Sequence, residues 1–316
     1  MKSSRSNGWG RTALCAGVLV SALLASCGGG SQGTIFTASR VVAFGDESSV
    51  IRADGFKYTV NGLAAGSTTT VDCLVNPIWV QTVAASYGLL FPECPGTVAD
   101  PVSRIYATNG AKVADLGGKI DEFLANGGFA EGDLVTVLVG ANDVVEQFAQ
   151  YPAVGEDQLL ANLDAAGAEL AAQVNRLAGL GAKVLVSTIP NMGLTPFAGD
   201  RTAGSTNGNP AVLTRLSTRF NDAMLSRLLN DGHKIGLIQL DEYLGAVDKA
   251  AQLGATTYAN TTTAACAVAL PNCTTNTLVA DAANAVWLWA DDRRLGPTGQ
   301  SNLGALAVNR AQNNPF

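Results

Sequence analysis

Four short runs rich in Val, Ile and Leu, each bounded by turn residues, constrain the fold of this chain most strongly. They occupy residues 40–44, 134–139, 183–187 and 235–240. Continuous apolar runs of this length are typical of parallel strands that are buried on both faces. Amphipathic stretches with helical spacing follow at residues 77–87, 113–125, 156–178, 209–231 and 298–311. Strands that alternate with helices predict an α/β fold, a doubly wound parallel sheet covered by helices as a three-layer sandwich.

The amino terminus has the pattern of an export signal. Lys2, Arg5 and Arg11 precede an apolar run at residues 13–24, and small residues follow up to Cys27. The run is shorter than the roughly 20 apolar residues that a membrane-spanning helix needs. Leu24-Ala25-Ser26-Cys27 resembles the bacterial lipobox, which implies a lipid with acyl chains such as palmitate on Cys27. An ordinary secretory signal with an incidental cysteine is the alternative.

The chain is therefore predicted to have three parts. Residues 1–26 are the expected lipoprotein signal peptide, residues 27–34 a flexible tether of small and polar residues, and residues 35–316 a single domain. The expected partner is therefore a lipid bilayer, reached through the acyl anchor in the cell envelope. Gly28 is not the aspartate associated with inner-membrane retention, so the outer membrane of a Gram-negative host is favoured.

The charge of the mature chain limits its other partners. Three of the 20 basic residues and none of the 26 acidic ones lie in the signal, which leaves a net charge near −9. Such a surface argues against nucleic acid and against electrostatic binding to anionic membranes.

Four cysteines remain besides Cys15 in the signal and Cys27. An even number in an exported protein predicts two disulfides, and local closure as Cys73–Cys94 and Cys266–Cys273 is the simplest of three pairings. A metal site would need ligand spacing such as C-x-x-C, which neither pair has, and no metal or cofactor is expected. Each disulfide would pin a polar insertion, at residues 48–75 and 258–279, expected to form loops or small hairpins.

Polar motifs follow the first two apolar runs, where the carboxyl ends of strands collect functional residues. Phe44-Gly45-Asp46-Glu47-Ser48-Ser49 follows the first run and Gly140-Ala141-Asn142-Asp143 the second, with residues 106–111, Tyr-Ala-Thr-Asn-Gly-Ala, between them. Near the end stand residues 290–299, Ala-Asp-Asp-Arg-Arg-Leu-Gly-Pro-Thr-Gly. Together these resemble, in order and spacing, the F-G-D-S, oxyanion-glycine, G-x-N-D and D-x-x-H blocks of the SGNH/GDSL hydrolase family. The resemblance runs from about Arg40 to the end and implies that family's fold and ester hydrolysis.

Two substitutions separate this chain from the active enzymes it resembles. Glu47 stands where the family has its nucleophilic serine, and Arg294 stands where it has its histidine base. A guanidinium stays protonated at biological pH and cannot accept a serine proton. The only histidine, His233, precedes the fourth strand and is expected at the opposite edge of the sheet.

Other family positions are kept. Gly110 and Asn142 match the oxyanion donors, and Asp291 matches the carboxylate that orients the histidine, while Asp46 is expected to support the loop. We therefore expect Glu47 and Arg294 to face each other across the former dyad as a bidentate ion pair.

Two functions remain open. The first is a lipoprotein with a substituted, inactive or weakened hydrolase site, which binds acyl or acetylated ligands. The second is an active esterase or lipase that uses Ser48 or Ser49 with Asn142, Gly110 and a non-standard base. The alternative role for both serines is a helix cap. A purely structural lipoprotein has no positive feature beyond the tether.

Overall fold

A parallel sheet of five strands, in the order β2-β1-β3-β4-β5, forms the centre of the computed structural model, which describes residues 36–199 and 209–316. The strands are β1 (Arg40–Gly45), β2 (Arg104–Ile105), β3 (Asp133–Leu138), β4 (Lys183–Ser187) and β5 (Ile235–Ile238). All four apolar runs form strands, so the predicted α/β fold is confirmed. β2 is a two-residue edge strand that no apolar run predicted.

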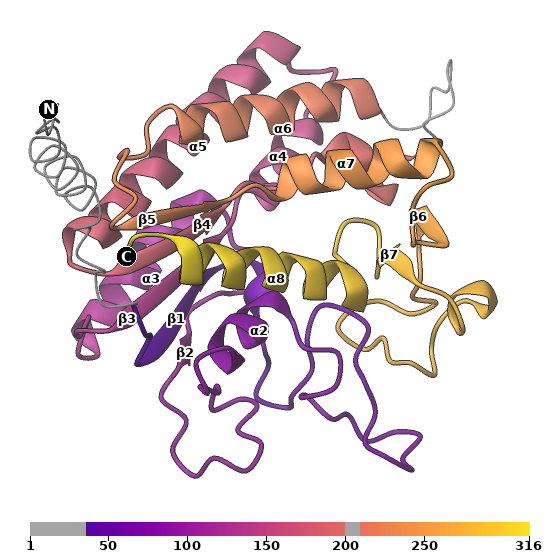
Figure 1. Ribbon diagram of the computed structural model, residues 1–316. Coiled ribbons are helices and arrows are strands. Elements are labelled where there is room, and N and C mark those ends of the chain that lie inside the picture. The colour runs from indigo at the N-terminus through magenta and orange to yellow at the C-terminus, as the bar shows by residue number, and fades with distance from the viewer. Residues whose placement is uncertain (1–35, 200–208) are drawn as a thin grey trace, which may run out of the picture. The chain divides into compact units, whose positions relative to one another are not determined.

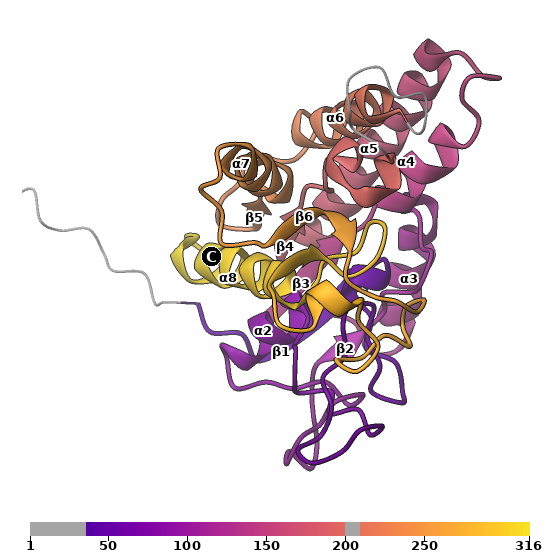
Figure 2. The ribbon, with the colours of Figure 1, turned by 90° about the vertical axis from the view of Figure 1, so that its right-hand side faces the viewer.

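Helices cover both faces of this sheet (Figures 1 and 2). They are α2 (Trp79–Ala85), α3 (Val113–Ala125), α4 (Ala141–Phe148), α5 (Glu156–Gly179), α6 (Pro210–Leu225), α7 (Leu240–Gln252) and α8 (Pro297–Asn313). α2 and α8 pack together on one face, α3 and α5 pack on the other, and α6 packs against α5. The five predicted helices are present, although α6 ends earlier than expected, and α4 and α7 were not predicted.

Short elements complete the described chain. The 3-10 turns are η1 (Glu47–Ser49), η2 (Met192–Leu194), η3 (Pro196–Ala198) and η4 (Ala280–Ala282), and the strands β6 (Asn260–Ala264) and β7 (Trp287–Trp289) pair in parallel. The two predicted disulfides are confirmed, Cys73–Cys94 and Cys266–Cys273, each with a Cα–Cα distance of 5.8 Å. Cys73, Cys266 and Cys273 lie in the two polar insertions, whereas Cys94 follows α2. The insertions form loops with isolated bridges, and the second also contains β6.

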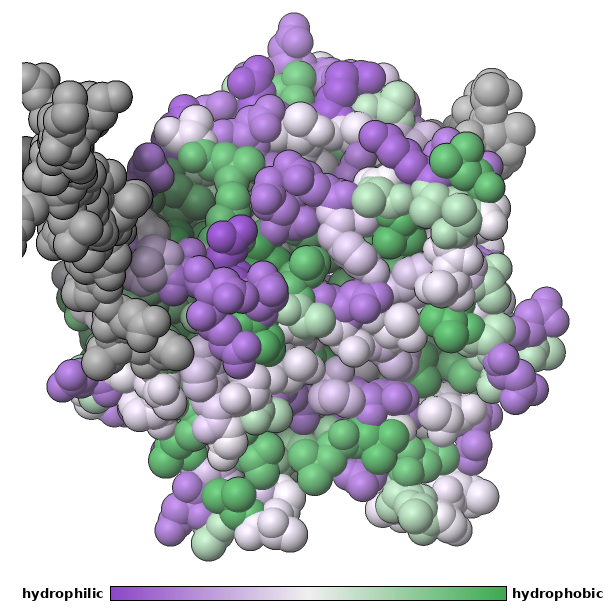
Figure 3. All heavy atoms as spheres, in the orientation of Figure 1, coloured by the Kyte–Doolittle hydropathy of each residue, from purple (hydrophilic) through white to green (hydrophobic). Residues whose placement is uncertain are grey.

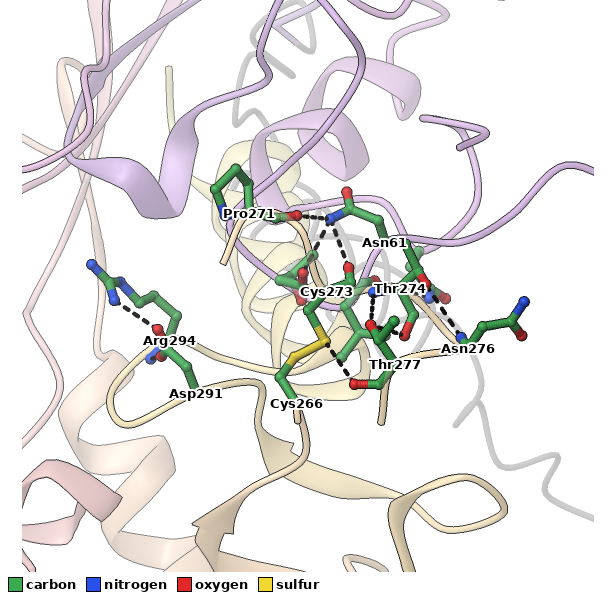
Figure 4. Close-up of a disulfide and its surroundings, with 12 residues drawn as sticks. Asn61, Cys266, Pro271, Cys273, Thr274, Asn276, Thr277, Asp291 and Arg294 are labelled. Atoms are coloured by element: carbon green, nitrogen blue, oxygen red, sulfur yellow. Dashed lines mark hydrogen bonds and ion pairs between the residues drawn. A yellow bond between two sulfur atoms is a disulfide. The ribbon is translucent and has the colours of Figure 1, made fainter. Parts of the chain in front are cut away.

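Asn61 joins the two insertions, although more than 200 residues separate their sequences. Its side-chain amide donates to the carbonyls of Pro271 and Cys273, at 2.8 and 3.0 Å, and its backbone N–H donates to Cys273 as well. Figure 4 shows this amide beside the Cys266–Cys273 disulfide. The first insertion also contacts the chain next to Arg294, because the Thr59 hydroxyl donates to the Leu295 carbonyl at 2.9 Å. The second insertion contacts the same segment, because the Cys266 N–H donates to the Ala290 carbonyl at 2.9 Å, so both insertions support residues 290–299.

Lys57 belongs to the first insertion and is fully buried. Its ammonium donates to the carbonyls of Cys73, Val75 and Asn76, at 2.8 to 2.9 Å. Burial lowers the pKa of Lys57 to about 8. These three carbonyls replace the water that the ammonium loses on burial. The side chain therefore joins Lys57, near the start of the insertion, to residues 73–76 at its end.

The expected signal, the lipidation site Cys27 and the tether at 27–34 lie outside the described residues. Within residues 36–199 and 209–316, no helix is long and apolar enough to cross a membrane. The same residues contain no cluster of three or more His, Cys, Asp or Glu side chains that could hold a metal ion.

Candidate active site

The two loops that carry the site leave β1 and β3 through glycines that no other residue could replace. A Cβ on Gly45 would lie 2.0 Å from the Leu138 carbonyl oxygen, and one on Gly140 would lie 2.2 Å from the ring of Phe220. Both glycines also have positive φ angles, 135° and 128°, which favour glycine. The close approach of the two strands therefore sets Glu47, in η1, near Asn142, in the first turn of α4.

Both carboxylate oxygens of Glu47 are occupied by donors from three other segments. Oε1 accepts from Arg294 Nε at 2.9 Å and from Arg294 Nη2 at 2.6 Å. Oε2 accepts from the Gly110 backbone N–H at 2.9 Å and from Asn142 Nδ2 at 3.0 Å. The side chain of Glu47 is only 4% exposed. The expected ion pair is present, but both guanidinium donors reach one oxygen, and the other oxygen occupies the two expected oxyanion donors.

Asp291 orients Arg294, as the family pattern implies for the residue that it matches. Asp291 Oδ2 accepts from Arg294 Nη1 at 2.6 Å, a pair that Figure 4 shows. Asp291 Oδ1 accepts from the backbone N–H groups of Arg293 and Arg294, at 3.0 and 2.7 Å. Arg294 thus lies between two carboxylates and is held by both.

The charges of this cluster stabilise one another. Burial raises the pKa of Glu47, but the Arg294 charge and the donors Gly110 and Asn142 outweigh it, so the pKa lies below its ordinary value. Burial lowers the pKa of Arg294, and the carboxylates of Asp291 and Glu47 outweigh burial and raise it. Both side chains are therefore charged at neutral pH, and neither is available to transfer a proton.

Asp46 lies directly before Glu47 and caps η1. Its Oδ1 accepts from the Ser48 backbone N–H at 2.9 Å, which confirms a supporting role for Asp46 in the loop. The side chain is buried, and burial, followed by the charge of Glu47, raises the pKa of Asp46 to about 7. A buried carboxyl next to a paired carboxylate thus prefers its neutral form below neutral pH.

This raised pKa predicts a pH-dependent effect of Asp46→Asn. Asp46 binds its proton more tightly in the folded protein than in the unfolded chain. The contribution of Asp46 to wild-type stability therefore falls as pH rises from about 4 to about 7. Asparagine keeps an acceptor oxygen for the Ser48 N–H and carries no charge. We expect the stability of Asp46→Asn relative to wild type to increase by on the order of 2 kcal/mol from pH 5 to pH 8, measured by urea unfolding. A difference that does not change with pH would contradict the buried, proton-binding Asp46.

The two serines after Glu47 have different surroundings. Ser49 is fully buried, and its hydroxyl accepts from Trp79 Nε1 at 3.1 Å. Ser48 is half-buried, and hydrogen bonds from its backbone N–H and its side chain to Asp46 both act to lower the pKa of that carboxyl. Neither serine caps η1, because Asp46 occupies that position. His233 is exposed at the amino end of β5, whereas the Glu47 cluster lies at the carboxyl ends of β1 and β3.

The sequence motifs contain every member of this cluster, but they do not predict that Glu47 accepts hydrogen bonds from Gly110 and Asn142 as well as from Arg294. Because both Arg294 donors bind Oε1, the second carboxylate oxygen is left for Gly110 and Asn142, and the predicted bidentate pair gave no signal of this. Asn142 Nδ2 also donates to the Ala111 carbonyl at 3.1 Å, which orients the amide. Asp143, the last residue of the same motif, points elsewhere and accepts from the Val113 N–H, at 3.1 Å, at the start of α3.

The structure is a doubly wound α/β fold with a buried carboxylate at the carboxyl ends of its central strands, surrounded by residues of the four sequence motifs. The sequence profile of the GDSL-like lipase/acylhydrolase family matches residues 41–292. The chain therefore belongs to this family.

Several solved structures are similar to this chain at low sequence identity. A member of the lipolytic G-D-S-L family from Veillonella parvula is 12% identical, with a TM-score of 0.45, over 85% of this chain and 96% of its own. A lipase from a goat rumen metagenome is 12% identical, with a TM-score of 0.49, over 86% and 97%. An acetylxylan esterase from Geobacillus stearothermophilus is 14% identical, with a TM-score of 0.46, over 87% and 95%. No curated protein matches the chain.

Proposed function

We propose that this chain is a non-hydrolysing member of the GDSL family, held in the bacterial cell envelope by a lipid on Cys27. One observation carries the proposal: Glu47 Oε2 accepts hydrogen bonds from both Gly110 and Asn142. In acyl transfer, such donors stabilise the oxygen of the tetrahedral intermediate. Here an internal carboxylate takes that place.

The position of the family's base is substituted as well. Hydrolysis through a hydroxyl requires a base with a pKa near the working pH. Arg294 occupies the base position and is permanently cationic between Asp291 and Glu47. The former dyad thus serves as an internal ion-pair cross-link between η1 and the loop before α8.

The arrangement also disfavours binding of an acyl or acetylated ligand at the oxyanion donors. The carbonyl of such a ligand would have to displace a charged carboxylate from two donors and separate it from Arg294. Of the two serines considered as displaced nucleophiles, Ser49 is bonded to Trp79 in the core. Only Ser48 could then be the nucleophile if the chain were an active ester hydrolase, which is the alternative.

Ester hydrolysis by the purified mature protein tests the proposal. We expect p-nitrophenyl acetate and p-nitrophenyl butyrate to be hydrolysed no faster than in buffer, at any pH from 6 to 9. Ser48→Ala and Ser49→Ala serve as matched variants, and a known GDSL esterase as the positive control. Turnover that is abolished by Ser48→Ala and survives Ser49→Ala would overturn the proposal in favour of a rearranged esterase.

A further inference from the structure

Large hydrophobic side chains are exposed together around α2. Leu74, Val75, Val98 and Val102 are each 39 to 46% exposed. Figure 3 shows hydrophobic residues gathered along the lower edge of the molecule, where Figure 1 draws the loops around α2. Apolar side chains grouped on one edge of a soluble domain mark a surface that contacts something apolar.

These side chains form one surface although they come from two segments. The Cys73–Cys94 disulfide joins the segments. A Cβ on Gly96 would lie 3.2 Å from Leu74 Cδ1 and 3.4 Å from Leu90 Cδ1, so these two leucines flank the same glycine. The Ser103 N–H donates to the Leu90 carbonyl, at 3.4 Å, which brings Val102 alongside. We call the surface formed by Leu74, Leu90, Val98 and Val102 the apolar rim.

The described chain begins beside the segment that connects α2 to the apolar rim. The ring of Phe36, the first described residue, lies 6.3 Å from that of Tyr87, centroid to centroid, and Tyr87 precedes Leu90 by three residues. Eight residues separate Cys27 from Phe36. Even fully extended, this segment spans only about 30 Å. A lipid on Cys27 would therefore hold Phe36, where the domain begins, within about 30 Å of the bilayer.

We infer that the apolar rim is the surface with which this protein lies on the lipid bilayer, an inference that rests on the proposed anchor at Cys27. Tethering gives the rim a high effective concentration at the membrane, so weak insertion of a few side chains suffices. Asp72 and Asp100 lie in the same loops, and the mature chain is acidic. The surface therefore fits neutral, zwitterionic lipid and not an anionic membrane.

Two tryptophan variants of the lipidated protein test this contact. Val98→Trp places an indole on the apolar rim, and Leu253→Trp places one at the 82% exposed residue after α7, at the far end of the molecule in Figures 1 and 2. Both lipidated variants are reconstituted into phosphatidylcholine vesicles, with and without brominated acyl chains. We expect bromolipid to quench the emission added by Val98→Trp about two-fold and to leave that of Leu253→Trp unchanged. Equal quenching of the two, or none of either, overturns the inference.

Flotation of the same vesicles separates this inference from the proposed anchor. Protein that floats but shows no preferential quenching at residue 98 keeps its anchor and has no membrane contact through the rim. If the protein does not float, the anchor proposal fails, and both variants are attached instead through an amino-terminal polyhistidine tag to nickel-chelating lipid. Preferential quenching of Val98→Trp then still supports the apolar rim, and equal quenching refutes it. Circular dichroism confirms that both variants fold as wild type does.

Discussion

Arg294→Met is expected to lower the free energy of unfolding by about 3–5 kcal/mol at pH 7.5, the range for removing one partner of a buried ion pair. The variant leaves the Glu47 carboxylate, whose side chain is 4% exposed, without its cation. The donors Gly110 and Asn142 remain, but they satisfy only Oε2. Urea unfolding followed by circular dichroism measures the loss.

The loss should depend on pH in a defined direction. Without Arg294, burial raises the pKa of Glu47, so the folded variant binds a proton more tightly than the unfolded chain. The stability of Arg294→Met should therefore be greatest at low pH and fall as pH rises, and the difference from wild type should be smaller at pH 5 than at pH 7.5. An equal loss at both values would mean that Glu47 is not the stranded charge.

Two further variants show whether the pair itself is responsible. Glu47→Gln combined with Arg294→Met removes both charges and should recover most of the loss, because the desolvation of an unpaired charge is removed. The ion pair of Arg176 with Asp121, whose side chains are 37% and 65% exposed, offers a matched control. Arg176→Met should cost no more than about 1 kcal/mol. If the double variant is as unstable as Arg294→Met, the loss of stability comes from the missing packing contacts of the arginine and not from an unpaired Glu47 charge.

The sheet could be predicted from sequence because its strands are buried on both faces. β1 and β3 consist of buried residues over nearly their whole length, so each appears as an uninterrupted apolar run. β2 has two residues, one of them exposed, and gives no such signal. α7 buries only Leu240 and Leu244, and its acidic first turn, which follows β5 directly, resembled a loop.

The site was predictable in its members but not in all of its contacts. Strand order and motif spacing bring η1, α4 and the loop before α8 together, which is why the pairing of Glu47 with Arg294 could be expected. The contacts of Glu47 Oε2 with Gly110 and Asn142 depend on side-chain geometry, which motif spacing does not encode. The contacts of Asn61 with Pro271 and Cys273 join loops without periodicity, and the burial of Lys57 depends on three carbonyls that a composition cannot reveal.

The retained groups predict that two substitutions restore a working centre. Glu47→Ser removes the carboxylate from Gly110 and Asn142 and introduces a hydroxyl at the nucleophile position. Arg294→His introduces a base with a pKa near 6.5, at a position where Asp291 already accepts hydrogen bonds. A base-activated hydroxyl beside preorganised donors is what ester hydrolysis requires.

We expect the double variant Glu47→Ser with Arg294→His to hydrolyse p-nitrophenyl acetate at least about 10²-fold faster than either single variant, since a positioned base contributes 10²–10⁴-fold. The rate should rise with pH through the titration of the introduced imidazole. Adding Asn142→Ala should reduce it by about 10²-fold or more, because one oxyanion donor is lost. If the double variant folds, as judged by circular dichroism and urea unfolding, yet is no faster than the single variants, then Gly110, Asn142 and Asp291 are not a retained catalytic frame. Activity unaffected by Asn142→Ala would place the hydrolysis outside this site.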